Sequence, residues 1–433
     1  LIAHKEEMIS VLNAETWFII STLLAPIGFV LQDVVADALT VEAIPKTDEK
    51  GNEIDFKTLK SLNVVMQLLG RVSIISGTLI VSFINLIMFS DSSEMSDNEK
   101  IVTYGKIYLY SLIVPIISIM GVVFSYISSK SRLNKLIKNG LPFEKAFNLI
   151  YPVLKATKPN KSIITGSIIF VIFTLSIGIS KIPFSQEIVF IGSFLIIVYL
   201  LIILSNQLDA VSKRMLIGTA IIIFVFRAMP GVGQGASWFE IDVLKFDQEF
   251  LSLLGLIASI LTIVGIFVLR PLMENASMSK LIIILSIAGS IFLLPSLAMF
   301  YGIHEITSKI TNGIVDARFI AIFNTALESP LGQVSMIPIL AWIAQSAPSH
   351  LKATFFAVLA SFTNLALSAS NLGTKYLNQI FVVTREVKSK TGEITTQADY
   401  SELGILLLTV LLLTLTLPIL ATILIRKLKL IAY

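Results

Sequence analysis

Three ionisable side chains fall inside two neighbouring apolar stretches near the start of the sequence. Asp33 and Asp37 are four residues apart, so they share one face of a helix. Arg71 stands ten residues into the next stretch, and Asp33 stands ten residues before the end of its own. At 1.5 Å per residue, both lie about 15 Å deep in a hydrocarbon core about 30 Å thick. An ion pair between Asp33 and Arg71 is therefore geometrically allowed.

Charges at this depth cost roughly 2.5–3.5 kcal/mol each on insertion scales, so they persist where they face a cavity or a partner. We expect Asp33, Asp37 and Arg71 to contact a substrate or a proton. The alternative is an ion pair that only holds two helices together. Gln67, one turn before Arg71, is a secondary candidate on the same face. Glu42 is another, although it could be a solvated helix end instead.

Arg227 and Glu328 are the corresponding candidates in the second half of the sequence. Pro230 and a glycine-rich run follow Arg227, which should break the helix and expose backbone groups to a cavity. Broken helices near the midplane often form transporter binding sites; a packing kink with a snorkelling arginine is the alternative. Glu328, with Asn324 one turn away, is the predicted proton carrier because a buried carboxyl group can gain and lose a proton. Its alternative role is structural pairing.

A polar stripe runs along residues 353–381 at spacings of three or four. Its members are Ser361, Asn364, Ser368, Asn371 and Lys375. Such a stripe can line a water path, and Asn364 and Asn371 are secondary pathway candidates on that basis. Hydrogen bonding between helices is the alternative, and it is common in membrane bundles.

Long apolar helices must position these residues, and the composition provides them. Hydrophobic residues make up 55% of the 433 residues and charged residues 14%, whereas soluble domains carry about 25% charged residues. A helix needs about 20 apolar residues to cross the hydrocarbon core. The predicted spans are 17–43, 61–89, 104–128, 163–181, 186–204, 215–235, 249–269, 281–301, 318–346, 353–381 and 403–425.

The charges of the loops predict the orientation. If the loop 44–60 is cytoplasmic, alternation places the basic segments 130–140 and 426–429 inside and the acidic segment 91–100 outside. This is the positive-inside pattern. The loop 382–402 is the exception, because it carries both basic and acidic residues on the outer side.

The longest polar segment, 129–162, contains apolar residues at helical spacing, among them Phe143, Phe147 and Ile150. This spacing predicts a short amphipathic helix on the inner membrane face. The alternative is a simple hinge between two halves of the molecule.

Several classes of function find no support in the sequence. There are no cysteines, and the three histidines are widely spaced, so no metal site is expected. No GxxxxGK[ST], HExxH or GxSxG motif occurs, and the run GVGQG at 231–235 lies in an apolar stretch rather than after a strand. We therefore expect no cofactor, no nucleic-acid partner and no enzymatic activity.

The segment QDVVADALTVEA (32–43) resembles the signature of the folate-biopterin transporter family, within the major facilitator superfamily. In that family two aspartates four residues apart precede a glutamate at the inner end of the fourth helix. Asp33, Asp37 and Glu42 match this order and spacing. The following stretch, from Ser61 onward, is similar to the family's fifth helix.

Two later stretches agree with this resemblance. Residues 227–255 are similar to the family's seventh helix, in which a proline is followed by an aromatic pair, and residues 336–373 are similar to its tenth-to-eleventh helix junction. There are departures from the pattern. Lys352 stands where the family often has an acidic residue, and the aromatic pair is Trp238 and Phe239 rather than Tyr-Phe.

The resemblance implies an all-α polytopic membrane protein with the two-bundle fold of the major facilitator type. It divides the chain into four parts: a partial N-terminal bundle (1–128), a cytoplasmic basic loop with the amphipathic helix (129–162), an extra transmembrane hairpin (163–204) and a C-terminal six-helix bundle (205–433). The first span would be the fourth helix, so three helices are expected upstream.

The resemblance further implies a proton-coupled secondary active transporter for folate, pterin or a related organic anion, in a bacterial inner or plasma membrane. Arg71 and Arg227 would attract carboxylates, while Asp33, Asp37 or Glu328 carries a proton. Two alternatives stay open: a transporter of the same fold for a nucleotide, muropeptide or amino acid, and a non-transporting membrane receptor or scaffold.

Overall fold

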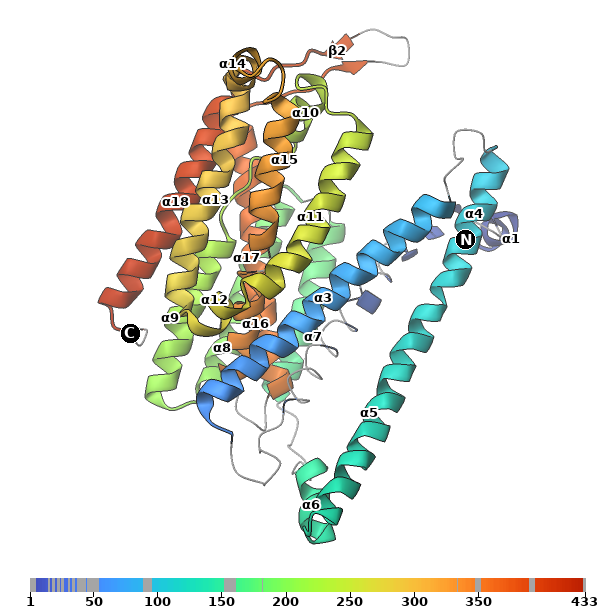
Figure 1. The fold of residues 1–433 in the computed structure, drawn as a ribbon, viewed down its shortest axis with the longest axis vertical. Coiled ribbons are helices and arrows are strands. Elements are labelled where there is room, and N and C mark those ends of the chain that lie inside the picture. Colours follow the sequence, from blue (N-terminus) through green and yellow to red (C-terminus); the bar gives the residue numbers. More distant parts are fainter. Residues whose placement is uncertain are drawn as a thin grey trace. The chain divides into compact units, whose positions relative to one another are not determined.

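The computed structural model describes scattered positions between residues 5 and 44 and then residues 54–88, 96–151, 161–180, 182–332, 334–346, 352–388 and 394–430. Nearly all of the described residues are helical. The one sheet among them is a short antiparallel hairpin of β1 (Val387–Lys388) and β2 (Ile394–Thr396). The chain divides into two compact units, one of residues 1–59 and 73–158 and one of residues 60–72 and 159–433. Figure 1 labels the elements of both.

Six helical segments in the described part of the chain are long and apolar enough to cross a membrane. They are Lys57–Val81, Ile101–Lys138, Ser185–Ser205, Met278–Phe300, Thr354–Ile380 and Leu403–Lys427. Two shorter apolar helical segments are Ile164–Gly178 and Leu253–Val268. The prediction of an all-α polytopic membrane protein is therefore confirmed. The predicted span 17–43 lies mostly outside the described residues.

The first unit contains α1 (Lys5–Val11), the C-terminal part of α3 (Phe56–Met88), α4 (Asp97–Ser111), α5 (Ile113–Lys138) and α6 (Phe143–Ile150). A capping box starts α4: the Ser96 hydroxyl accepts from the Glu99 N–H, and the Glu99 carboxylate accepts from the Ser96 N–H at 2.7 Å. The helix ends at Ser111, four residues before Pro115, because a proline cannot donate to the carbonyl at that distance.

Helix α5 continues to Lys138, well past the predicted end of the span at residue 128. Its basic C-terminal segment contains no proline or glycine before Gly140, whose φ of +91° turns the chain toward α6. Within α6 the ring centroids of Phe143 and Phe147 lie 5.7 Å apart. A helix thus forms where the apolar spacing predicts one, and its place on the membrane surface stays a prediction.

The second unit combines residues 60–72 of α3 with the remaining helices. These are α7 (Lys161–Ile179), α8 (Ser185–Ser205), α9 (Ala210–Arg227), α10 (Gln234–Asp242), α11 (Gln248–Val268), α12 (Arg270–Asn275), α13 (Met278–Phe300), α14 (Ile303–Ile310), α15 (Ala317–Glu328), the 3-10 turn η1 (Ser329–Leu331), α16 (Met336–Ser346), α17 (Lys352–Ile380) and α18 (Leu403–Lys427). Side-chain oxygens of Asp209, Asp247, Ser277 and Asp316 accept backbone N–H groups at the starts of α9, α11, α13 and α15.

The core of the second unit is built around α18, which packs along α13 and α9. Small residues allow the close approach: Gly404 packs against the ring of Phe300, and the Ser290 hydroxyl donates to the Leu411 carbonyl at 3.3 Å. The buried cluster at one end of α18 consists of Phe239, Leu403, Leu406, Leu407 and Val410.

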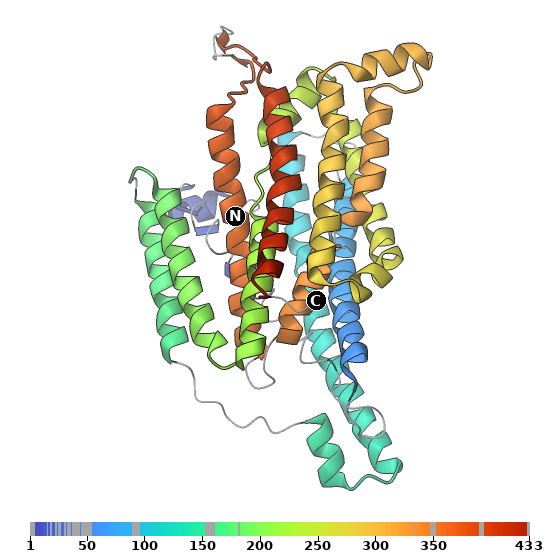
Figure 2. The same ribbon diagram turned by 90° about the vertical axis from the view of Figure 1, so that its left-hand side faces the viewer.

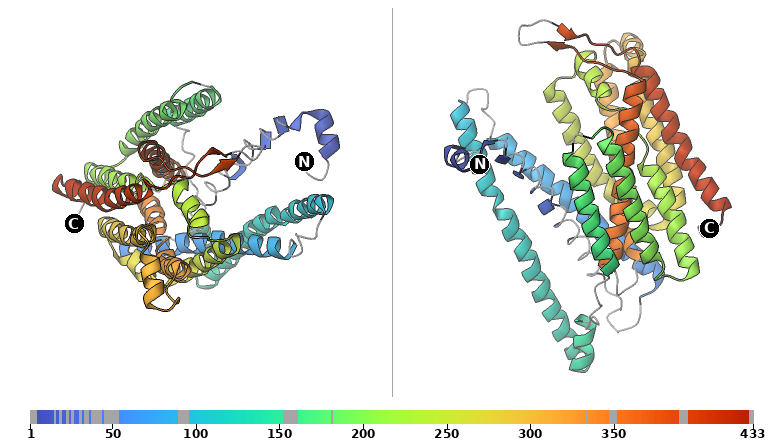
Figure 3. Two further views of the ribbon diagram at one scale, coloured as in Figure 1. Left: turned by 90° about the horizontal axis from the view of Figure 1, so that it is seen from above. Right: turned by 180° about the vertical axis from the view of Figure 1, so that it is seen from behind.

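Helices α7 and α8 form an antiparallel pair at one edge of the second unit, drawn in green in Figure 2 and seen from above in Figure 3. Gly192 of α8 packs against the ring of Phe173 on α7. On its other side α8 packs against α17. The ring centroids of Phe194 and Phe224 lie 5.8 Å apart, and those of Phe224 and Phe362 lie 5.1 Å apart. Aromatic contacts thus connect α8, α9 and α17. The division of the chain into the four predicted domains stays a prediction.

Candidate functional site

Helix α9 ends at Arg227, as the proline and glycines after it predict. The chain is not helical again until Gln234, where α10 begins. Pro230 lacks the N–H that would continue the helix, and Gly233 has a φ of +81°, a conformation that favours glycine. The predicted single span 215–235 is therefore a helix followed by an unwound segment, residues 228–233.

The unwound segment takes hydrogen bonds from one face of α17. The Ser370 hydroxyl donates to the Met229 carbonyl at 2.6 Å, and the Asn378 amide donates to the Val232 carbonyl at 3.1 Å. Between them the Gly231 N–H donates to Thr374 Oγ1 at 2.8 Å. We expected the freed backbone groups to face a cavity, whereas these three are satisfied by a neighbouring helix. The spacing of four between Ser370, Thr374 and Asn378 is the sequence signal that could have found this contact.

The Arg227 guanidinium is partly buried and incompletely paired. Its Nη1 lies 3.0 Å from the Met336 sulfur at the start of α16, a weak acceptor. Its Nε is buried and has no hydrogen-bond partner within the described ranges. Arg71 of α3 belongs to the same unit and is close enough for the two like charges to repel. No ion pair to either arginine occurs within the part of the chain that the structure describes. The pair therefore presents positive charge and an unused donor.

Glu328 ends α15, and its carboxylate accepts a long hydrogen bond of 3.4 Å from the Asn324 amide. The chain then turns through η1, so the predicted span 318–346 is divided into α15 and α16. A close crossing with α11 holds this turn: Gly265 packs against the backbone of Pro330, and Thr262 Oγ1 donates to the Ser329 carbonyl at 3.0 Å. Glu328 forms no ion pair with Arg227, although both are described.

Asp33, Asp37 and Glu42 lie outside the described residues, so their predicted contacts stay predictions. Gln67 of α3 is buried, at 4% exposed. Near the start of the same helix the Ser61 hydroxyl donates to Glu274 of α12 at 3.0 Å.

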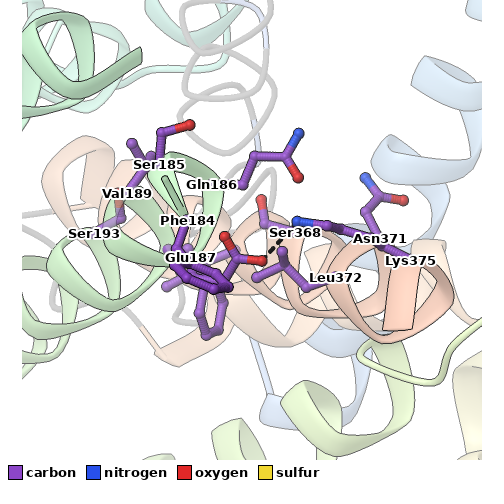
Figure 4. Close-up of a pocket in the computed structure, with 12 residues that line it drawn as sticks. Phe184, Ser185, Gln186, Glu187, Val189, Ser193, Ser368, Asn371, Leu372 and Lys375 are labelled. Carbon is purple, nitrogen blue, oxygen red and sulfur yellow. Dashed lines mark hydrogen bonds and ion pairs between the residues drawn. The ribbon is translucent and has the colours of Figure 1, made fainter. Parts of the chain in front are cut away.

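The polar stripe on α17 divides into two parts. Ser368, Asn371 and Lys375 line a cavity of about 710 Å³ together with the first turns of α8 (Figure 4). Asn364 does not line this cavity and is exposed. Ser361 donates to the carbonyl of Ala357 in its own helix. Asn371 is thus the secondary candidate that the structure places at a cavity.

Glu187 is the residue that the sequence analysis did not single out. It lies in the first turn of α8, and its Oε1 accepts from Lys375 Nζ at 2.7 Å and from the Tyr376 hydroxyl at 2.8 Å. Figure 4 shows this ion pair on the wall of the cavity. The signal available was an acidic residue at the start of a strongly apolar helix, where the helix dipole favours a negative charge.

A second ion-pair network joins α10 to the loop before α18. Arg385 donates to both carboxylate oxygens of Asp242, at 2.8 and 2.9 Å, and the Tyr400 hydroxyl donates to the same carboxylate at 2.7 Å. Hydrogen bonds from Arg385 and then from Tyr400 lower the pKa of Asp242. Burial, together with the bond to Asp242, raises the pKa of Tyr400 to about 12. The positive charge of Arg385 in this loop is thus paired with a carboxylate.

Comparison with known proteins places the chain in a family. The sequence model of the BT1 family matches residues 4–432, nearly the whole chain. This chain belongs to the BT1 family. The predicted resemblance to the folate-biopterin transporters is thereby confirmed, and this BT1-family chain is a multi-pass integral membrane protein.

A curated relative has a matching name. The folate-biopterin transporter of Synechocystis sp. is 22% identical over 157 residues, which cover 36% of this BT1-family chain and 31% of that protein. The match therefore spans about a third of the relative's length. No solved structure matches the chain. The relative's name is that of a membrane transporter.

Proposed function

We propose that this chain belongs to a secondary active transporter that moves folate, pterin or a related small organic anion across a membrane. The proposal is supported chiefly by the proximity of two arginines, Arg71 and Arg227. Two like charges are held near each other, and within the described ranges no acidic side chain neutralises them. A carboxylate between them would remove the repulsion and use the free Nε of Arg227.

We propose a transport cycle of the major facilitator type. Two helical bundles rock around a central site, so that the anion is exposed to each side in turn. A proton bound at Asp33, Asp37 or Glu328 accompanies the anion and offsets one of its negative charges. The membrane potential therefore acts on a smaller net charge than that of the anion alone.

The test uses the full-length protein in proteoliposomes and labelled folate. Replacing Arg227 by Gln removes a charge-assisted hydrogen bond worth about 1.5–3 kcal/mol, so the KM for folate should rise about tenfold or more. Arg214→Gln is the matched control, because Arg214 is an exposed basic residue on the same helix. An unchanged KM in Arg227→Gln, with Arg71→Gln also unchanged, would exclude the arginine pair as the anion site.

Proton coupling has its own test. Uptake should fall when a protonophore dissipates the proton gradient, and Glu328→Gln should reduce that dependence if Glu328 carries the proton. If uptake does not depend on the proton gradient, proton coupling is excluded, and the protein would instead let the anion move down its own gradient. The absence of any flux, with binding retained, would favour a receptor over a transporter.

A further inference from the structure

The cavity between α8 and α17 is separate from the arginine pair. Its volume of about 710 Å³ falls within the range of known small-ligand sites. Its lining combines apolar side chains, such as Phe190 and Leu365, with Glu187, Asn371 and Lys375. Neither Arg71 nor Arg227 lines it. We propose that this cavity binds the headgroup of a zwitterionic phospholipid that carries a primary ammonium, of the phosphatidylethanolamine type.

The unused hydrogen-bonding groups of Glu187 and Lys375 match such a headgroup. Glu187 Oε1 accepts both Lys375 and Tyr376, whereas Glu187 Oε2 is buried and has no partner among the described residues. A buried carboxylate oxygen without a donor is costly, so an ammonium N–H at this position is stabilising. Lys375 donates to Glu187 and keeps further N–H groups, because an ammonium has three donors. A ligand with an ammonium for Glu187 and a phosphate for Lys375 matches both ends.

The position of the cavity favours a lipid over a free zwitterion. Glu187 lies in the first turn of α8, and Lys375 lies near the end of α17 at Ile380, so the ion pair is at one end of two candidate membrane spans. That level is where headgroups meet the hydrocarbon core. An exposed apolar stripe then runs along α8 away from the cavity. It consists of Ile188, Ile191, Leu195 and Ile202, which are 36–62% exposed. Acyl chains can lie along this stripe while the headgroup occupies the cavity.

The test measures binding to the full-length protein in detergent by native mass spectrometry, with three lipids and one soluble headgroup compound as probes. Phosphatidylethanolamine should bind at least about tenfold more tightly than phosphatidylcholine with the same chains, because a quaternary ammonium has no N–H for Glu187. Phosphatidylglycerol, which lacks the ammonium, should also bind weakly. Water-soluble glycerophosphoethanolamine should bind far more weakly than the lipid, because it lacks the acyl chains.

Variants assign the binding to this cavity. Glu187→Gln should abolish the preference for phosphatidylethanolamine over phosphatidylcholine. Lys375→Met should weaken the binding of both lipids, because both carry the phosphate that Lys375 would contact. Glu305→Gln is the matched control, because Glu305 is an exposed acid in the first turn of α14, and it should keep the preference. If the unmodified protein binds phosphatidylethanolamine and phosphatidylcholine equally, the proposal is overturned. This comparison needs no variant, so it holds even if Glu187→Gln or Lys375→Met fails to fold. Tight binding of the soluble headgroup also overturns it, in favour of a free zwitterion.

Discussion

The close crossing of α11 and η1 yields a quantitative prediction at Gly265. A Cβ added at Gly265 would lie 2.5 Å from the Pro330 carbonyl oxygen. The obstacle is backbone rather than a flexible side chain, so the Gly265→Ala variant must separate the two elements. Overpacking of this kind costs about 1–3 kcal/mol, and the upper half of that range applies where backbone cannot yield.

Alanine also stabilises a helix relative to glycine by about 1 kcal/mol, which would conceal part of the cost. Gly255 of the same helix removes this ambiguity, because a Cβ there meets nothing within 4 Å. Both variants gain the same helix propensity. The difference in unfolding free energy between Gly265→Ala and Gly255→Ala therefore isolates the steric cost, which we expect to be about 2–3 kcal/mol.

The assay is reversible unfolding of the purified protein in mixed micelles by increasing mole fractions of sodium dodecyl sulfate, followed by tryptophan fluorescence. Gly255→Ala should unfold at or above the detergent fraction of the unmodified protein, and Gly265→Ala well below it. If the two variants differ by less than about 0.5 kcal/mol, the crossing of α11 and η1 is not as close as described, and the placement of Glu328 that depends on it is wrong.

Three further predictions concern other contacts of the second unit. The pKa of Asp242 is lower in the folded protein than in the unfolded chain, so its bonds to Arg385 and Tyr400 stabilise the protein above the unfolded pKa. This stabilisation is lost as the pH falls through the folded pKa. Thermal unfolding scans from pH 6 to pH 3 should show the loss, and the Asp242→Asn variant should lack this part of the pH dependence. Tyr400→Phe should cost about 1 kcal/mol near neutral pH, because one hydrogen bond is lost, and a denaturation midpoint that does not move would contradict this. Gly192→Leu should push the Phe173 ring out of its contact with α8, and a cysteine pair placed across α7 and α8 should then cross-link more slowly than in the unmodified protein.

Local features of the sequence predict much of the helical framework. Apolar length indicates the membrane helices, and the break after Arg227 follows from Pro230 and the glycines, which act within one turn. Interruption of the span 318–346 has an equally local cause, Pro330. The predicted span 318–346 is therefore made of α15, η1 and α16 rather than of one helix.

The contacts between distant segments could not be predicted in this way. Glu187 and Lys375 are 188 positions apart in sequence, and no periodicity within either helix states which face meets the other. The same holds for Asp242 and Arg385, 143 positions apart. Tertiary packing decides such pairs, and a single sequence holds no direct record of it. The predicted roles of Arg71, Arg227 and Glu328 in transport stay predictions.

Helix α17 carries two sets of contacts on adjacent faces. Ser370 and Thr374 hold the unwound backbone after Arg227, and Lys375, one position and about 100° further round, holds Glu187 of α8. One helix therefore contacts both the unwound segment after α9 and the first turn of α8. A displacement of α17 large enough to exceed the reach of the Lys375 side chain would break both sets of contacts together.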